Sequence, residues 1–265
     1  MRRTVSATLE LEIREPAEIA LQIAVTAGER IDEVLDIQLD GTPAAALEVP
    51  GSHGGRAHVL QPGRGLLVVS YTATVIGRAA PLLCAADERL VYVRPSRYAE
   101  SDRLAEVAAR EFGGLSGAEN ILAGVSSWVG GHIGYEAGSS LPTHGAVDTL
   151  LGGRGVCRDF AHLVVALLRA RDVPARVAAV YAPGLAPMDF HAVAEALVGD
   201  TWRVVDATLL APRSSLVRIA TGRDAADTAF LTVLGGTVDL VGIEVGAIIE
   251  GTLPSDDPRA LVSLG

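Results

Sequence analysis

Residues 153–170, GRGVCRDFAHLVVALLRA, decide the fold of this chain. Ala161, Val165 and Ala166 leave little polar face between the large apolar residues, which recur at helical spacing: Val156, Phe160, Leu163, Val164, Leu167 and Leu168. A helix with so little polar surface must be covered by other elements. Asp172-Val173-Pro174 ends it, because proline cannot continue a helix. The stretch therefore predicts a buried helix with Cys157 in its first turn.

The place of Cys157 on this helix favours a nucleophile. The first turn carries unpaired N–H groups and the positive end of the helix dipole, which stabilise a thiolate. The Gly-Arg-Gly before the cysteine lets other chain segments approach closely. A free cysteine on an apolar helix can instead be an unreactive residue packed in the core, and that alternative stays open. Cys84 has none of these features and is interpreted as a core residue.

Three strands are predicted after the helix, over residues 175–182, 191–198 and 201–208. If Gly199-Asp200 is a two-residue hairpin turn, cross-strand partners sum to 399, and His191 and Asp206 share one face. Such diagonal neighbours lie roughly 7 Å apart at Cα. The aspartate could then accept the Nδ1–H of the imidazole and present Nε2 to a thiol. A one-residue slip would place the pair on opposite faces.

The N-terminal part of the chain alternates apolar and polar residues with period two, as in residues 5–13, 19–25, 35–39 and 67–73. Turn residues separate these runs. The pattern predicts an antiparallel β-sandwich over residues 1–84, followed by a mixed helix and strand domain over residues 85–265. The fold class is therefore α+β. No chemistry is expected in the sandwich, where His53 and His58 are interpreted as exposed residues.

Composition excludes several kinds of function. The net charge is −10 without any basic run, so nucleic acid is not expected as a partner. The 22 basic residues are all arginine, which excludes a Schiff-base lysine and a Walker-type phosphate loop. His132, His144 and His162 do not form a zinc-type cluster with the cysteines, and no metal or other cofactor is expected. With two cysteines, no signal segment and no long apolar span, we expect a reduced, cytoplasmic protein away from membranes.

Several segments resemble the transglutaminase-like superfamily, in particular bacterial members with an N-terminal β domain that are often labelled cysteine proteases. They are PSRYAESD (95–102), SWVGGHIGYEAGSS (127–140), residues 153–181, FHAVAEALVGDTWRVVDAT (190–208) and GRDAAD (222–227). The resemblance implies a papain-like core and a catalytic triad of Cys157, His191 and Asp206. Val193 stands where the family often has tryptophan, which indicates altered packing beside the site.

The resemblance also bears on the oxyanion hole. Transglutaminases place a tryptophan side chain there, but neither Trp128 nor Trp202 can be assigned to that role. The backbone N–H of Cys157 is the one oxyanion donor we expect from the sequence.

The expected function is acyl transfer by a cysteine enzyme through a thioester, with a peptide or carboxamide as substrate. Hydrolysis, as in a peptidase or amidase, is favoured because the bacterial relatives are mostly described as peptidases. Transglutaminase-type amine transfer and a non-catalytic peptide-binding module remain alternatives. The β domain either packs on the catalytic domain or docks a partner, in which case it would show an exposed apolar patch or an open edge.

Overall fold

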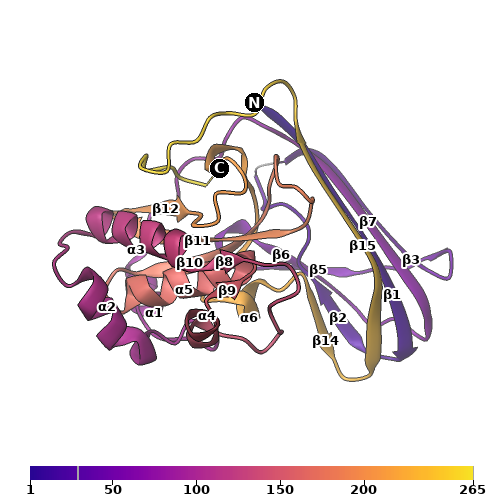
Figure 1. The fold of residues 1–265 in the computed structure, drawn as a ribbon. Helices are drawn as coiled ribbons and strands as arrows, with labels where there is room; N and C mark the ends of the chain where they lie inside the picture. Colours follow the sequence, from indigo (N-terminus) through magenta and orange to yellow (C-terminus); the bar gives the residue numbers. More distant parts are fainter. Residues whose placement is uncertain (29, 265) are drawn as a thin grey trace.

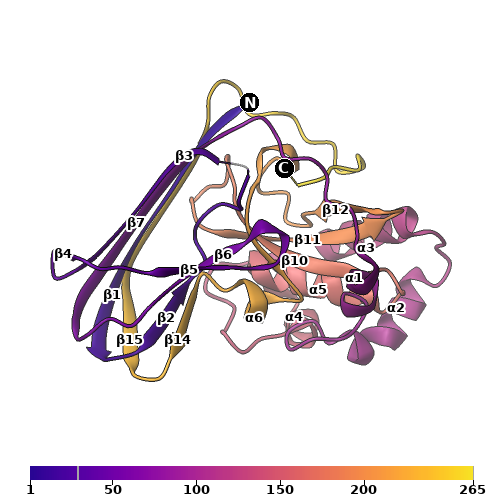
Figure 2. The ribbon, with the colours of Figure 1, turned by 180° about the vertical axis from the view of Figure 1, so that it is seen from behind.

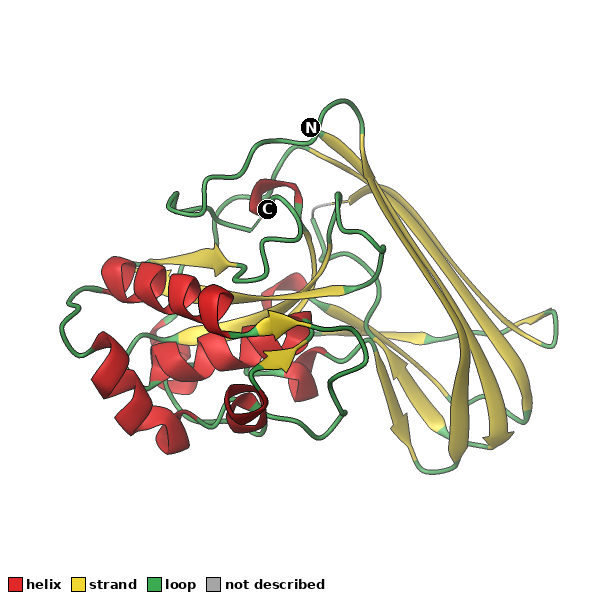
Figure 3. Cartoon of the chain, in the orientation of Figure 1, coloured by secondary structure: helices red, strands yellow, loops and turns green. Residues whose placement is uncertain are grey.

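The computed structural model describes residues 1–28 and 30–264 and shows a β-sandwich beside a helix-covered sheet (Figure 1). The two parts meet along one face of that sheet, and the helices of residues 105–169 lie on the side away from the sandwich (Figure 3). The α+β class predicted from the sequence is confirmed. No helix among the described residues is long and apolar enough to cross a membrane.

A four-stranded antiparallel sheet, in the order β12-β11-β10-β13, supports the candidate site. Its strands are β10 (Ala175–Tyr181), β11 (His191–Val198), β12 (Thr201–Val205) and β13 (Val217–Gly222). The central helix α5 (Cys157–Arg169) packs on β10 and β11 and begins at Cys157, as its apolar pattern predicts. Three helices cover α5: α2 (Ala105–Phe112), α3 (Ala118–His132) and α4 (Ala146–Gly152).

The β-sandwich has one sheet in the order β15-β1-β7-β3-β4 and a second in the order β14-β2-β6-β5. Its strands are β1 (Arg2–Glu15), β2 (Glu18–Leu21), β3 (Arg30–Leu39), β4 (Thr42–Pro43), β5 (Leu47–Pro50), β6 (Arg56–Leu60), β7 (Gly65–Ile76), β14 (Leu231–Leu234) and β15 (Thr237–Ile249). Every second residue of β1 from Val5 to Ile13 is buried, so the period-two pattern marks the core face.

The last two strands lie in the sandwich, whereas the sequence placed them in the second domain. The strand β15 pairs with β1, with Arg3 opposite Ile249, and β14 pairs with β2 (Figure 2). The predicted division at residue 84 therefore does not follow the sheets, because residues 231–249 complete the sandwich. Their apolar pattern suits either domain, and only long-range pairing decides between them.

The sandwich and the sheet behind α5 share one apolar core. Tyr181 and Val217 of that sheet are buried among sandwich residues, and the Tyr181 hydroxyl donates to the Ile23 carbonyl at 2.7 Å. The Thr26 N–H donates to the Arg218 carbonyl at 3.1 Å. This close packing agrees with the simpler interpretation of the β domain as a support for the sheet. The edge of the sandwich at β15 is nevertheless open among the described residues.

The remaining elements are short connections. They are the 3-10 turns η1 (Ser52–Gly54), η2 (Ser101–Leu104) and η3 (Arg213–Ser215), the helices α1 (Ala86–Val91) and α6 (Ala225–Thr228), and the two-residue strands β8 (Gly134–Tyr135) and β9 (Arg154–Gly155).

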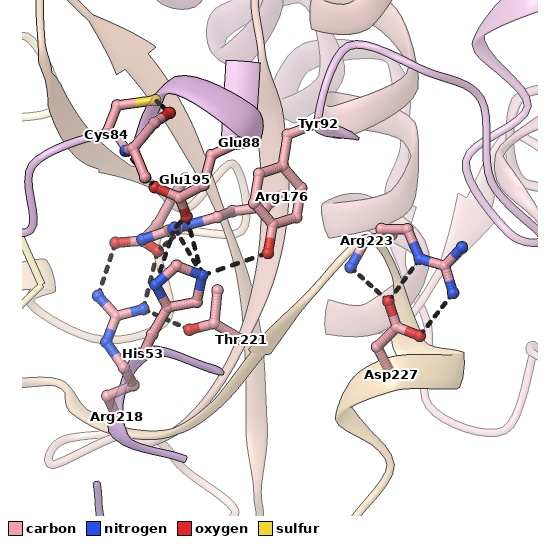
Figure 4. A network of polar contacts seen from close by, with 11 residues as sticks. His53, Cys84, Glu88, Tyr92, Arg176, Glu195, Arg218, Thr221, Arg223 and Asp227 are labelled. Carbon is pink, nitrogen blue, oxygen red and sulfur yellow. Dashed lines mark hydrogen bonds and ion pairs between the residues drawn. The ribbon is translucent and has the colours of Figure 1, made fainter. Parts of the chain in front are cut away.

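A buried chain of charges links the sandwich to the sheet (Figure 4). The Glu195 carboxylate lies between two guanidinium groups, 2.8 Å from Arg176 Nε and 2.7 Å from Arg218 Nη2. Arg176 Nη1 also donates to Glu88 at 2.9 Å. His53 Nε2 lies 3.0 Å from the same Glu88 oxygen, so a histidine of the sandwich joins the chain.

Two expectations about sandwich histidines were wrong. His53 lies in this charge chain, and His58 is only 7% exposed, within β6. Both side chains are therefore enclosed by partners that short-range sequence patterns do not reveal.

Candidate active site

The hairpin of β11 and β12 has the register predicted from the sequence. Val198 pairs with Thr201 and Ala194 with Val205, so that partners sum to 399. Gly199 adopts a φ of 63° in the turn, a left-handed conformation that glycine accepts without steric cost. His191 begins β11 and Asp206 directly follows β12. The fold thus brings the two side chains together as the register requires.

His191 and Asp206 form a buried ion pair, with Nε2 and Oδ2 2.8 Å apart. The other aspartate oxygen accepts from Thr208, at 3.0 Å from the backbone N–H and 2.6 Å from the hydroxyl. Burial opposes the charged imidazolium, but the Asp206 carboxylate and the neighbouring Cys157 outweigh it and raise the pKa of His191 to about 10. His191 is therefore an imidazolium at neutral pH.

The ring orientation of His191 differs from the expected one. Nε2, and not Nδ1, lies on Asp206. Nδ1 is buried and has no hydrogen-bond partner among residues 1–28 and 30–264, while the Cys157 thiol interacts with the ring. With Nε2 occupied by Asp206, Nδ1 is the nitrogen left to face the thiol. The hairpin register places the pair correctly but carries no information about the ring flip.

Hydrogen bonds at the start of α5 hold Cys157 in place. The Asp159 carboxylate accepts from the Val156 N–H at 2.8 Å and from the Ser140 hydroxyl at 2.8 Å. Arg158 donates to the same hydroxyl at 2.7 Å, so Arg158 and Asp159 both have structural partners in Ser140. A Cβ at position 155 would lie 2.6 Å from the Asp159 Cβ, so the glycine there is required by close approach. The thiol is half-buried and uncrosslinked.

Tyr135 is a residue at this site that the sequence analysis missed. Its phenol oxygen interacts with the backbone N–H of Cys157. The strand β8 brings it there by pairing in parallel with β9, which places Tyr135 opposite Gly155. The available signal was the proximity of Tyr135 to the Gly-rich loop, but a two-residue strand leaves no periodic pattern.

The other candidate residues lie elsewhere. Trp128 stacks on His132, with ring centroids 4.2 Å apart, and Trp202 lies under the Arg176 guanidinium at 3.9 Å. Cys84 is half-buried at the margin of the Trp202 cluster, not inside the core as expected. Across the described part of the chain, no group of three or more histidine, cysteine, aspartate or glutamate side chains is arranged to hold a metal ion.

His162 is a buried structural residue of α5. Its Nε2 accepts from the Ala225 N–H at 3.0 Å and its ring stacks on Tyr98. Burial lowers the pKa of His162 from 6.5 to about 3. The unfolded chain therefore binds this proton at a higher pH than the folded protein does. Stability from this group is complete above pH 6.5 and falls as the pH drops from 6.5 toward 3.

We expect His162→Gln, which cannot take up the proton, to lose less stability on acidification than the natural protein. The free energy of unfolding lost between pH 6.5 and pH 5 should be smaller in the variant by about 2 kcal/mol. Urea unfolding at the two pH values measures it. An unchanged acid dependence would show that other groups dominate, and His144→Gln, at a half-buried position in the loop before α4, serves as the control.

The chain is similar to known proteins in sequence and in fold. The family model of the transglutaminase-like superfamily matches residues 106–207. A Cytophaga hutchinsonii protein described as a "Putative Cysteine Protease" shares 30% identity at a TM-score of 0.87, covering 98% of this chain and 96% of that chain. The periplasmic domain of TgpA from Pseudomonas aeruginosa shares 17% identity at a TM-score of 0.41, covering 77% of this chain and 90% of that chain. No curated protein matched the chain.

The chain belongs to the transglutaminase-like superfamily, as the resemblance of its motifs predicted. The matched region includes Cys157, His191 and Asp206, whereas nearly all of the sandwich lies outside it.

Proposed function

We propose that this protein is a cysteine acyl-transfer enzyme that acts on peptide or carboxamide bonds, with Cys157, His191 and Asp206 as its catalytic residues. The buried His191–Asp206 pair beside a cysteine that begins a helix carries the proposal. An imidazolium that persists at neutral pH is the partner that a thiolate nucleophile needs.

In the first half of the reaction, the Cys157 sulfur attacks the carbonyl carbon and forms a C–S bond. His191 donates its Nδ1 proton to the leaving amine as the C–N bond breaks. A thioester remains on Cys157. In the second half, His191 takes a proton from water or from an amine as that group attacks the thioester, and the thiolate leaves. Asp206 holds the ring through Nε2 and stabilises its charged form throughout.

Water as the second acceptor gives a peptidase or amidase, which we favour. The support is the Cytophaga hutchinsonii relative, which matches almost the full length of this chain and is described as a protease. Amine transfer uses the same thioester and differs only in the acceptor. A reduced, cytoplasmic environment remains part of the proposal, since the nucleophile must be a free thiol.

An acyl-enzyme experiment tests this function. A fluorescent thiol probe first labels the reactive cysteine, and a library of peptides and primary amides is then screened for turnover. With a substrate in hand, acid quenching and intact-mass measurement should show an adduct on Cys157 equal to the acyl group. The products formed in the presence of a primary amine separate the two reactions. Hydrolysis of the thioester releases a carboxylic acid, whereas amine transfer releases a new amide. A protein that shows no adduct with any acyl donor would instead be a binding module.

Asp206→Asn tests the role of the carboxylate. Asp206 is the largest of the groups that oppose burial and raise the pKa of His191 to about 10, and Cys157 adds to its effect, so removal of the Asp206 charge should lower that pKa. In the natural protein kcat/KM should fall as the pH rises through about 10. In Asp206→Asn this fall should come at a lower pH, with activity at pH 7.5 reduced by at least about 10²-fold.

A pH profile of kcat/KM measures the shift. Thr208→Val is the matched control, because it removes a hydroxyl from Asp206 but keeps the carboxylate, and only a small shift is expected. If kcat/KM of Asp206→Asn still fell at the same alkaline pH as in the natural protein, Asp206 would not be the group that raises the pKa of His191.

A further inference from the structure

Tyr135 occupies a position that the proposed reaction leaves without an explanation. Two backbone hydrogen bonds fix its strand beside the loop before Cys157, from Gly134 N–H to Gly153 at 2.9 Å and from Glu136 N–H to Gly155 at 3.0 Å. Its ring packs near Phe160 of α5, with centroids 6.1 Å apart. The side chain is nevertheless 48% exposed. A large ring held firmly at its base but open to solvent can contact a ligand.

Tyr135 lies opposite Gly155, two residues before Cys157, and its phenol oxygen interacts with the backbone N–H of Cys157. That N–H is unpaired within the helix, because it belongs to the first turn of α5. When the Cys157 sulfur attacks a substrate, this N–H is placed to donate a hydrogen bond to the carbonyl oxygen. The phenol thus lies beside the position that the reacting carbonyl oxygen must take.

The surroundings of Tyr135 keep its phenol protonated. Partial burial raises its pKa, and the nearby Cys157, Asp189 and Asp206 raise it further, against the lowering effect of the Cys157 N–H. The hydroxyl is therefore a donor over the whole working range of a thiolate enzyme. A negatively charged substrate oxygen beside the hydroxyl would accept a hydrogen bond from it.

We propose that Tyr135 is the second oxyanion donor of the site and acts together with the Cys157 N–H. This inference rests on the proposed acyl-transfer function. When the Cys157 sulfur adds to the carbonyl carbon, the C=O π electrons move to oxygen, and the oxyanion accepts hydrogen bonds from the phenol and from the backbone. When the C–N bond breaks, the carbonyl forms again and both donors keep their hydrogens. The same pair serves the second tetrahedral intermediate during thioester breakdown.

The tryptophan side chains do not compete for this role. Trp202 lies under Arg176 in the charge chain, on the sheet face that meets the sandwich, and Trp128 packs against Phe112 and His132 on α3. The donor that remains is Tyr135, which lies on β8 and is held by β9 directly before the start of α5.

Tyr135→Phe is the direct test, because it removes the hydroxyl and keeps the ring that packs on Phe160. We expect kcat for an amide substrate to fall about 10²-fold while KM stays within about twofold, since an oxyanion donor acts in the transition state. A peptide aldehyde forms a hemithioacetal on Cys157 that places an oxygen in the same position. Its inhibition constant should therefore rise in Tyr135→Phe. Tyr98→Phe is the matched control and should leave all three constants unchanged.

A merely structural role for Tyr135 predicts a different result. It would weaken ground-state binding, which is measured as peptide affinity in the Cys157→Ala background with and without Tyr135→Phe. We expect no change there. If Tyr135→Phe kept the kcat of the natural protein, or if its whole effect lay in ground-state affinity, the assignment would be wrong. Failure of the proposed function is distinct, because it would appear as absence of any Cys157 acyl adduct in the natural protein.

Discussion

Cys157→Ala should abolish turnover of any amide or peptide substrate, by at least about 10⁴-fold in kcat, because no other group can form the thioester. The acyl adduct in intact-mass spectra should vanish with it. The fold should persist, since the thiol is half-buried and its removal leaves the hydrogen bonds of Asp159 at the helix start intact. Circular dichroism and peptide binding check that the variant is native.

Cys84→Ala is the matched control for this prediction. It removes the second free thiol, which lies at the margin of the Trp202 cluster, and burial raises the pKa of that thiol. We expect normal activity and normal labelling of Cys157 by a thiol probe. Full activity in Cys157→Ala, or loss of activity only in Cys84→Ala, would contradict the assignment of the nucleophile.

Glu195→Gln should cost about 3–5 kcal/mol of unfolding free energy, because it leaves two buried guanidinium groups without their shared counter-charge. Burial alone would raise the pKa of Glu195, but Arg218 and Arg176 outweigh it and lower that pKa to about 2. The carboxylate is therefore charged at neutral pH. Urea unfolding at neutral pH measures the loss.

Glu136→Gln provides the contrast for Glu195→Gln. Glu136 pairs with Arg154 at 3.2 Å, and both side chains are more than half exposed, so its loss should change stability by less than about 1 kcal/mol. Similar effects of the two substitutions would mean that the buried charges contribute no more than a surface pair. Because Glu195 lies on the strand that begins with His191, a weakened sheet should also reduce activity.

Local patterns predicted the parts of the site that depend on short-range geometry. The apolar spacing of residues 153–170 placed Cys157 in the first turn of α5, and the Gly199-Asp200 turn set the register that joins His191 to Asp206. Both depend on chain segments that are close in sequence. The turn chemistry and the helix period are therefore sufficient to derive them.

Features that depend on distant parts of the chain could not be derived in the same way. Nothing in the residues around His53 reveals Glu88 or Arg176, which reach it only after the sandwich packs on the sheet. The position of Tyr135 depends on a two-residue parallel ladder, and the ring flip of His191 depends on which side Asp206 and Cys157 occupy. The β15 strand has the pattern of any edge strand, so its partner β1 was not predictable from the sequence.

The pairing of β1 with β15 has a consequence for how the chain folds. Residues at opposite ends of the sequence must meet before the larger sheet of the sandwich is complete, as Val5 pairs with Ala247. Loop closure over such a separation is slow compared with local contacts. The sheet that carries His191 can form from nearby segments, whereas the sandwich cannot finish until β15 is available. During synthesis, β1 would expose an unpaired strand edge while the domain that carries His191 assembles, and such an edge can pair with another chain.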